Sequence, residues 1–314
     1  MKNDFINFLE KNDVEMLKKV EKTDLHNHAT YSCTKKYLVD SGISLPPDDS
    51  VTDIASLNSF IRTYINPLQY NIDTLPILLK GNFENCISTG VKIVAPSIDY
   101  KSCIRVFNSD INKFIKFLQN FQYENLIILW DLGISRDGYV DEHKDLIIQL
   151  IKTKFFTGID LYAVENSKSN ILFTEFYDLA NNMGIVTKVH AGEQLGADYV
   201  LACINDFNPK QIQHGIRIIE DEKVMALAKK KGILFNVCPT SNVVLGYAKS
   251  IGEHPIKIMY KKGLKISLAT DDLLFFNSDI NNEYLILFNN GVLSAQQLDE
   301  IRKNGLMQST FVKE

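Results

Sequence analysis

Four short polar segments follow or end apolar runs in the sequence, and they hold residue types that bind metal ions and transfer protons. They cover residues 24–28, 189–193, 213–215 and 269–272. Neutral imidazoles with one carboxylate make a good zinc site, and a free glutamate beside such a site can move protons. The sequence therefore predicts a zinc hydrolase whose metal ligands are gathered by the ends of parallel strands.

The candidate metal ligands come from three of these segments. His26 and His28 are two positions apart, so on a strand both side chains point to the same face. His190 ends the predicted fifth strand and Asp271 ends the predicted eighth. Barrel enzymes place catalytic residues at the C-terminal ends of their strands. Three imidazoles and one carboxylate leave a position for water, which a zinc ion acidifies.

Three more residues are candidates for proton transfer. Glu193 follows His190 by three positions, so we expect it to contact substrate and not the metal; the alternative is a first-turn helix carboxylate. His214 ends the predicted sixth strand, although a lone buried histidine is usually structural. Asp272 can orient water or accept a substrate N–H. It can stay ionised beside Asp271 because a metal ion offsets the repulsion between paired acids.

Short apolar runs alternate with helix-like stretches through most of the chain. Eight strands alternating with helices over about 250 residues predict a (β/α)8 barrel, or TIM barrel. The alternative is a doubly wound open sheet, but no glycine-rich phosphate-binding turn follows the first strand. The expected strands cover residues 23–27, 91–98, 125–131, 156–161, 185–190, 211–214, 233–238 and 265–270, and expected helices include residues 142–152, 171–181 and 221–231.

Residues 31–76 interrupt this alternation. They contain a proline- and aspartate-rich turn at residues 46–49 and a predicted helix over residues 53–64, with few strand signals. A long excursion after the first barrel strand is typical of a segment that covers a substrate. We therefore expect residues 1–314 to form one barrel domain in which insertion 31–76 covers the site.

The charge of the chain argues against a nucleic-acid partner. The formal net charge is −4 at pH 7 and the sequence pI is about 5.9. A nucleic-acid-binding domain normally has a basic face and a high pI. The basic run at residues 229–231 precedes a glycine and is best interpreted as a solvated helix C-terminus. The sequence predicts a small-molecule partner, not a nucleic acid.

The five cysteines are scattered and form no CxxC pair. This pattern fits a reducing compartment and argues against disulfides or a cysteine-based zinc site. We expect Cys238 to be a buried, inert thiol, because no cationic neighbour is apparent to lower its pKa. Residues 1–20 lack the apolar stretch of a signal peptide, and no segment approaches membrane-spanning length. The sequence predicts a cytoplasmic protein that does not bind a membrane.

The segments DLHNH, KVHAGE, QHG, CPTSN and SLATDD match, in order and spacing, the motifs of the adenosine deaminase family within the amidohydrolase superfamily. The match runs from residue 23 to residue 273. A barrel strand of two-metal relatives ends in a carbamylated lysine, but residues 161–165 contain no lysine. The resemblance implies one zinc ion per chain, bound by His26, His28, His190 and Asp271.

The same resemblance implies roles for the neighbouring residues. Glu193 resembles the acid that protonates purine N1, and His214 the residue that orients and deprotonates the catalytic water. Asp272 resembles the group that engages this water or purine N7. Residues 158–165 resemble the segment after the fourth strand whose backbone N–H reaches purine N3, which Ala163 would supply here.

Two features concern the rest of the substrate pocket. Residues 56–62 resemble the family's apolar lid helix, which would place Phe60 and Ile61 over the ligand; the alternative is ordinary amphipathic packing. The turn after His28 lacks the acid that contacts the ribose 5′-hydroxyl in adenosine deaminases. Thr30 offers only a neutral hydrogen bond there. The resemblance supports the reaction more strongly than it supports any particular sugar pocket.

The leading interpretation is hydrolytic deamination of adenosine or a closely related 6-aminopurine nucleoside by a monomer or homodimer. A second keeps the barrel and zinc but acts on adenine, an adenine nucleotide or an N6-modified adenosine. A third is a non-catalytic purine-binding paralogue. The presence of Glu193 and His214 beside intact ligands argues against the third, because degenerate paralogues tend to lose proton-transfer residues first.

Overall fold

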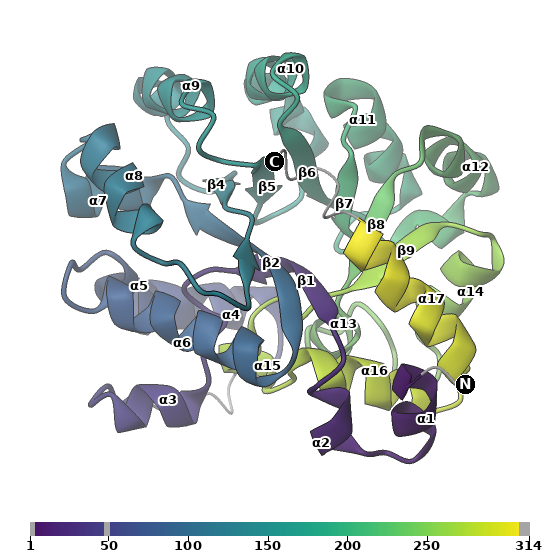
Figure 1. The fold of residues 1–314 in the computed structure, drawn as a ribbon. Helices are drawn as coiled ribbons and strands as arrows, with labels where there is room; N and C mark the ends of the chain where they lie inside the picture. Colours follow the sequence, from purple (N-terminus) through teal and green to yellow (C-terminus); the bar gives the residue numbers. More distant parts are fainter. Residues whose placement is uncertain (1–3, 47–50, 308–314) are drawn as a thin grey trace.

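The computed structural model describes residues 4–46 and 51–307. Eight parallel strands follow one another around the sheet in chain order, and helices surround them (Figure 1). This is the predicted (β/α)8 barrel. Its strands are β1 (Lys22–His28), β2 (Val91–Asp99), β4 (Asp131–Ser135), β5 (Gly158–Tyr162), β6 (Val186–Ala191), β7 (Gln211–His214), β8 (Leu234–Val237) and β9 (Lys265–Leu268).

The helices lie outside this sheet and cover it with apolar side chains (Figure 1). The longer ones are α6 (Leu75–Ser88), α8 (Ile111–Gln119), α9 (Lys144–Lys152), α10 (Thr174–Asn182), α11 (Ala197–Phe207), α12 (Glu222–Lys231), α16 (Ile280–Asn289) and α17 (Ala295–Leu306). Shorter ones are α1 (Asp4–Glu10), α2 (Val14–Leu17), α7 (Lys101–Phe107), α13 (Pro239–Val244), α14 (Ile256–Lys261) and α15 (Leu273–Phe276). None of the described helices has the length and apolar character needed to cross a membrane.

The barrel closes through the loop that follows β9. The backbone N–H of Asp271 donates to the carbonyl of His26 at 3.0 Å, and the N–H of His28 lies 3.4 Å from the carbonyl of Asp271. These contacts form an isolated parallel bridge between Asn27 and Asp271. Closure therefore fixes Asp271 directly against the end of β1.

The third barrel strand lies further along the chain than predicted. Within residues 125–131 the two-residue strand β3 (Ile127–Ile128) pairs with β2, and the barrel strand β4 begins only at Asp131. Strand β4 contains Asp131, whose carboxylate lies 2.6 Å from the Nζ of Lys188 inside the barrel. A buried ion pair thus interrupts the apolar pattern that would have marked this strand. The predicted helices 142–152 and 171–181 begin later, at Lys144 and Thr174, after the 3-10 turns η2 (Asp141–His143) and η3 (Ser167–Leu172).

Four helical segments lie between β1 and α6. They are α3 (Lys35–Asp40), α4 (Ile54–Phe60), the π-helix η1 (Ile61–Ile65) and α5 (Asn66–Gln69). The Asp53 side chain caps α4 and exchanges hydrogen bonds with Ser56 in a capping box, which is the expected start of a helix. The proline- and aspartate-rich turn predicted at residues 46–49 lies mostly outside the described residues.

Candidate active site

Four residues expected to bind metal meet at the C-terminal end of the barrel. His26 and His28 come from β1, and His190 comes from β6; ring nitrogens of the three lie within 4.8 Å of one another. One carboxylate oxygen of Asp271 lies 3.3 Å from the Nε2 of His26 and 3.5 Å from that of His28. All four residues are buried. The strand ends and the barrel closure therefore bring distant parts of the sequence to one point.

The protonation states of His28 and Asp271 suit a bound cation. Burial lowers the pKa of His28 below its ordinary value, which favours the neutral imidazole that binds metals. Burial raises the pKa of Asp271, but the side chains of His26, His214 and His28 lower it by more. The pKa therefore lies well below its usual range, and the carboxylate is ionised. Neutral imidazoles around one carboxylate are the donor set that zinc prefers.

Buried atoms in the cluster also fit a metal ion. Both ring nitrogens of His26 and both of His190 are buried without a hydrogen-bond partner among the described residues. Buried polar atoms are normally satisfied, so such groups need an explanation. The Nδ1 of His190 lies 3.3 Å from a carboxylate oxygen of Asp160 on β5, as expected for a ligand oriented by an acid behind it. The His190 Nε2 is then left for a metal.

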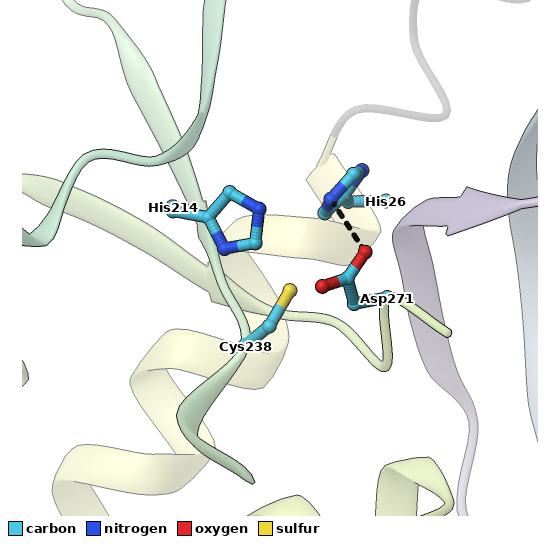
Figure 2. A group of neighbouring side chains, drawn as sticks. All are labelled: His26, His214, Cys238 and Asp271. Carbon is cyan, nitrogen blue, oxygen red and sulfur yellow. Dashed lines mark ion pairs between the residues drawn. The ribbon is translucent and has the colours of Figure 1, made fainter. Parts of the chain in front are cut away.

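A second cluster overlaps the first. His26, His214, Cys238 and Asp271 also offer ligand atoms within 4.8 Å of one another, and Figure 2 shows the Cys238 thiol beside Asp271. Burial raises the pKa of this thiol well above its ordinary value, and the Asp271 carboxylate raises it further. A metal ligand must be a thiolate. The neutral thiol makes this the weaker of the two ligand sets.

The Nδ1 of His214 lies 3.5 Å from a carboxyl oxygen of Glu193, and the side chain of Asn242 contacts both groups. The Nδ2 of Asn242 donates to the Glu193 carboxyl at 3.3 Å and lies 3.2 Å from the Nδ1 of His214. Burial raises the pKa of Glu193 well above its usual range, and Asp271 raises it further. Burial lowers the pKa of His214 well below its usual value. At neutral pH the pair therefore offers one group that can give a proton and one that can take it.

Three candidate site residues have left-handed backbone, which side chains disfavour. The φ angles are 74° at Ala163, 61° at His214 and 60° at Asp271. Each residue follows or ends a barrel strand, where the chain turns sharply. Strained conformations of this kind cluster at functional sites. The backbone geometry therefore supports the same location for the site as the side-chain cluster does.

A cavity of about 390 Å³ opens from this cluster. Asp272, Ala163 and Ile61 on η1 line it. Phe60 instead packs on another side of the helix, beside Leu274, because adjacent helical residues point about 100° apart. Burial raises the pKa of Asp272 well above its usual range, with Asp271 adding to the effect.

Thr30 lies in the wall beside this cavity. It is buried, and its hydroxyl donates to the Oε1 of Gln69 at 2.8 Å. Gln69 lines the cavity and in turn donates to Asn66 at 2.5 Å. The turn after His28 is therefore joined to the cavity wall by a neutral hydrogen-bond chain.

Several residues that hold the site in place had no predicted role. Ser241 donates to Asp271 at 2.6 Å, and the Glu165 carboxylate accepts from the backbone N–H of Glu193 at 3.0 Å. Arg136 donates to the carbonyl of His190 at 2.8 Å. Ser241 and Asn242 belong to the CPTSN motif and Glu165 to segment 158–165, so motif membership was the available signal. Arg136 had none, because it follows the misplaced strand.

Comparison with known proteins agrees with this arrangement. An adenosine deaminase family model matches residues 113–314. The adenosine deaminase of Plasmodium gallinaceum is 29% identical over 98% of this chain and 95% of its own length. An adenine deaminase of Marinomonas sp. (strain MWYL1) is 26% identical over 94% of this chain and 93% of its own length.

Two solved structures have the same fold. The adenine deaminase of Arthrobacter aurescens has a TM-score of 0.76 and 21% identity, with 94% of each chain covered. The Arabidopsis N6-mAMP deaminase has a TM-score of 0.79 and 19% identity, with 96% of each chain covered. The family match extends over more than half of the sequence and includes the strands that supply His190 and His214, so the chain belongs to the adenosine deaminase family of hydrolytic deaminases, which act on C–N bonds.

Proposed function

We propose that this chain is a zinc-dependent hydrolase that converts adenosine, or a closely related 6-aminopurine nucleoside, into the 6-oxopurine and ammonia. The observation that carries the proposal is the meeting of His26, His28, His190 and Asp271 with unpartnered imidazole nitrogens at the base of an open cavity. These four residues would hold one zinc ion per chain. When bound, zinc lowers the pKa of a water molecule towards neutrality.

The proton-transfer groups fit the difficulties of this reaction. C6 of an aminopurine is a poor electrophile, and ammonia is a poor leaving group unless protonated. Glu193, whose pKa is raised by burial, would hold a proton for purine N1. His214, kept neutral by burial, would take a proton from the attacking water. General acid–base groups with pKa values moved in opposite directions are the expected pair.

Other cavity residues would orient the purine. The carboxyl of Asp272, which lines the cavity beside Asp271, would engage purine N7 or the attacking water. The backbone N–H of Ala163 would reach N3, and Ile61 would cover the base. We propose that insertion 31–76 covers the site and that it belongs to the single barrel domain of residues 1–314.

A free base is the second candidate substrate, because adenine deaminases occur among the relatives. The cavity favours the nucleoside. The lining extends from His28 and Glu193 to Asn66 and Gln69. It then reaches the side chains of Arg62, Lys101 and Arg105. This space would be left unused by adenine alone, whereas a good site buries most of its ligand.

The proposal is tested by measuring ammonia release from adenosine and from adenine by purified, zinc-loaded protein. We expect adenosine to be the better substrate, with inosine and ammonia formed in equal amounts. His190→Ala and Asp271→Ala should lose zinc, while the matched variant Cys238→Ala should keep it. Zinc loss in Cys238→Ala with retention in His190→Ala would instead place the metal in the overlapping cluster. Absence of turnover with every 6-aminopurine tested would contradict the function itself.

A further inference from the structure

The cavity has a buried end lined by acidic groups and an exposed mouth lined by arginines. Its buried end carries the carboxyl groups of Glu193, Asp271 and Asp272. The rest of the lining includes three cations from two different elements: Arg62 on η1, and Lys101 and Arg105 on α7. Both arginines are exposed, so they lie at the mouth. A ligand reaching from end to end would meet acids first and arginines last.

Arg105 stacks on an aromatic ring, and its guanidinium donates no hydrogen bond to the residues that the structure describes. Its guanidinium lies 4.4 Å from the centre of the Tyr70 ring, and Tyr70 lines the same cavity. Stacking of this kind leaves the in-plane N–H groups available. Among the residues that the structure describes, no carboxylate lies within 4.0 Å of Arg105 or of Arg62. Two guanidinium groups at the cavity mouth are therefore without an ion pair among the described residues.

Two acids, Asp99 and the exposed Asp137, also line this part of the cavity, and the carboxylate of Asp99 is engaged. One oxygen of Asp99 accepts from the Tyr162 hydroxyl at 2.5 Å, and the other accepts from the Lys101 backbone N–H at 2.7 Å. The Lys101 ammonium donates to the Asp137 carbonyl at 2.9 Å. These contacts engage both oxygens of Asp99 and one donor of the Lys101 ammonium. With Asp99 and Asp137 counted, the three cations of this part of the lining still exceed its acids by one, and Arg62 and Arg105 are the cations without an ion pair among the described residues.

The wall between the two ends is neutral. Gln69 and Asn66 line it, and the buried Thr30 hydroxyl bonds to Gln69. A carboxylate in this position would repel an anion passing along the wall, but an amide does not. The hydroxyl-rich sugar of a nucleoside suits such a wall, because amides both donate and accept hydrogen bonds.

We propose that the substrate is a 6-aminopurine nucleoside 5′-monophosphate, whose phosphate lies between Arg62 and Arg105. The purine occupies the buried end, the ribose follows the Gln69 wall, and the phosphate reaches the mouth. Guanidinium groups match phosphate oxygens in geometry and charge. This inference rests on the proposed deamination and specifies the substrate class of the same site.

The test compares AMP with adenosine in the same zinc-loaded preparations. In the wild type, kcat/KM for AMP should exceed that for adenosine. The ratio of the two should fall about 10- to 100-fold in Arg105→Gln and in Arg62→Gln, the range expected for a lost charge-assisted hydrogen bond. Lys116→Gln is the matched control: Lys116 is exposed on α8 outside the cavity lining, so the ratio should not change. Each ratio is measured within one preparation, which cancels differences in folded fraction.

Equilibrium binding separates the inference from the reaction. IMP should bind the wild type more tightly than inosine does, and Arg105→Gln should abolish this advantage whether or not catalysis is measured. Adenosine turnover with no preference for AMP, or an AMP preference unchanged in both arginine variants, would overturn the phosphate site and leave deamination standing. No ammonia from either substrate, with IMP still preferred over inosine, would overturn the proposed reaction while supporting the phosphate site.

Discussion

At the scale of single residues, burial sets the chemistry of the reaction centre. Glu193 and His214 both contact Asn242, yet burial moves their pKa values in opposite directions, because it disfavours the charged form of each. An acid becomes harder to ionise and an imidazole harder to protonate. One physical effect therefore produces both a proton donor and a proton acceptor.

Replacing Glu193 by glutamine tests the donor. Glu193→Gln should keep its zinc and still bind purine, because Glu193 lies outside the proposed ligand set, while kcat falls by roughly 10²- to 10⁴-fold. Metal analysis with steady-state kinetics measures both quantities. Loss of zinc, or a kcat near that of the wild type, would show that the carboxyl has a different role.

His254 gives a residue-scale prediction about stability. Its side chain is buried, its Nδ1 accepts from the backbone N–H of Ile256 at 3.1 Å, and burial lowers its pKa to about 4. The unfolded chain then binds a proton that the folded chain excludes, so stability is lost as pH falls from about 6.5 towards 4. Between pH 7 and pH 5 the loss should be roughly 2 kcal/mol.

His254→Asn is the matched variant, because its amide oxygen can accept from Ile256 but does not titrate. Denaturant unfolding of both proteins at pH 7 and pH 5 gives the comparison, and the other histidines cancel in the difference. Between pH 7 and pH 5, the free energy of unfolding of His254→Asn should fall by about 2 kcal/mol less than that of the wild type. Equal losses in the two proteins would mean that His254 is protonated in the folded state.

At the scale of elements, the turns after the strands place the site. Gly192 separates His190 from Glu193 and has a φ of 78°. A Cβ added there would lie 2.5 Å from a methyl group of Val200. Gly192→Ala should therefore lower the free energy of unfolding by more than the strain of a left-handed backbone would. It should also displace Glu193 and so lower kcat.

Gly291→Ala is the control for this effect, because Gly291 has a φ of 64° and open space around it. It should lose only about 1–2 kcal/mol, the cost of left-handed backbone with a side chain, with kcat unchanged. Gly192→Ala should lose roughly 1–3 kcal/mol more through overpacking. Thermal unfolding and kinetics of the pair measure this, and equal effects would show that the turn tolerates the methyl group.

The alternation of elements was predictable from the sequence, and so was the gathering of the ligand candidates at strand ends. Strand β4 was not, because Asp131 is satisfied by Lys188, a partner 57 positions away that local pattern cannot reveal. The position of Phe60 was not predictable either, because it packs against Leu274 and Phe275, which lie more than 200 positions later in the sequence. The supports Ser241, Glu165 and Arg136 act through tertiary contacts that spacing alone does not specify.

At the scale of the whole molecule, the proposed zinc site joins both ends of the barrel. It would link β1, β6 and the loop after β9, which is also where the sheet closes. A ligand bound only by the folded state stabilises it, by about 4 kcal/mol at a thousand times its Kd. Chelation should therefore lower the Tm by several degrees.

The double variant His190→Ala with Asp271→Ala is the control for this Tm shift, since it should respond little to the chelator. Scanning calorimetry with and without chelator makes the comparison. An unchanged Tm in the wild type would mean that no tightly bound metal joins these strands. An equal shift in the double variant would place the stabilising metal elsewhere.

The most direct test of the account is a titration of zinc into metal-free protein while the conversion of adenosine to inosine is followed. The four-ligand site predicts that the rate rises in proportion to added zinc and stops rising at about one equivalent per chain. Full activity before any zinc is added, a plateau at two equivalents, or no inosine at saturating zinc would contradict a deaminase with a single zinc ion.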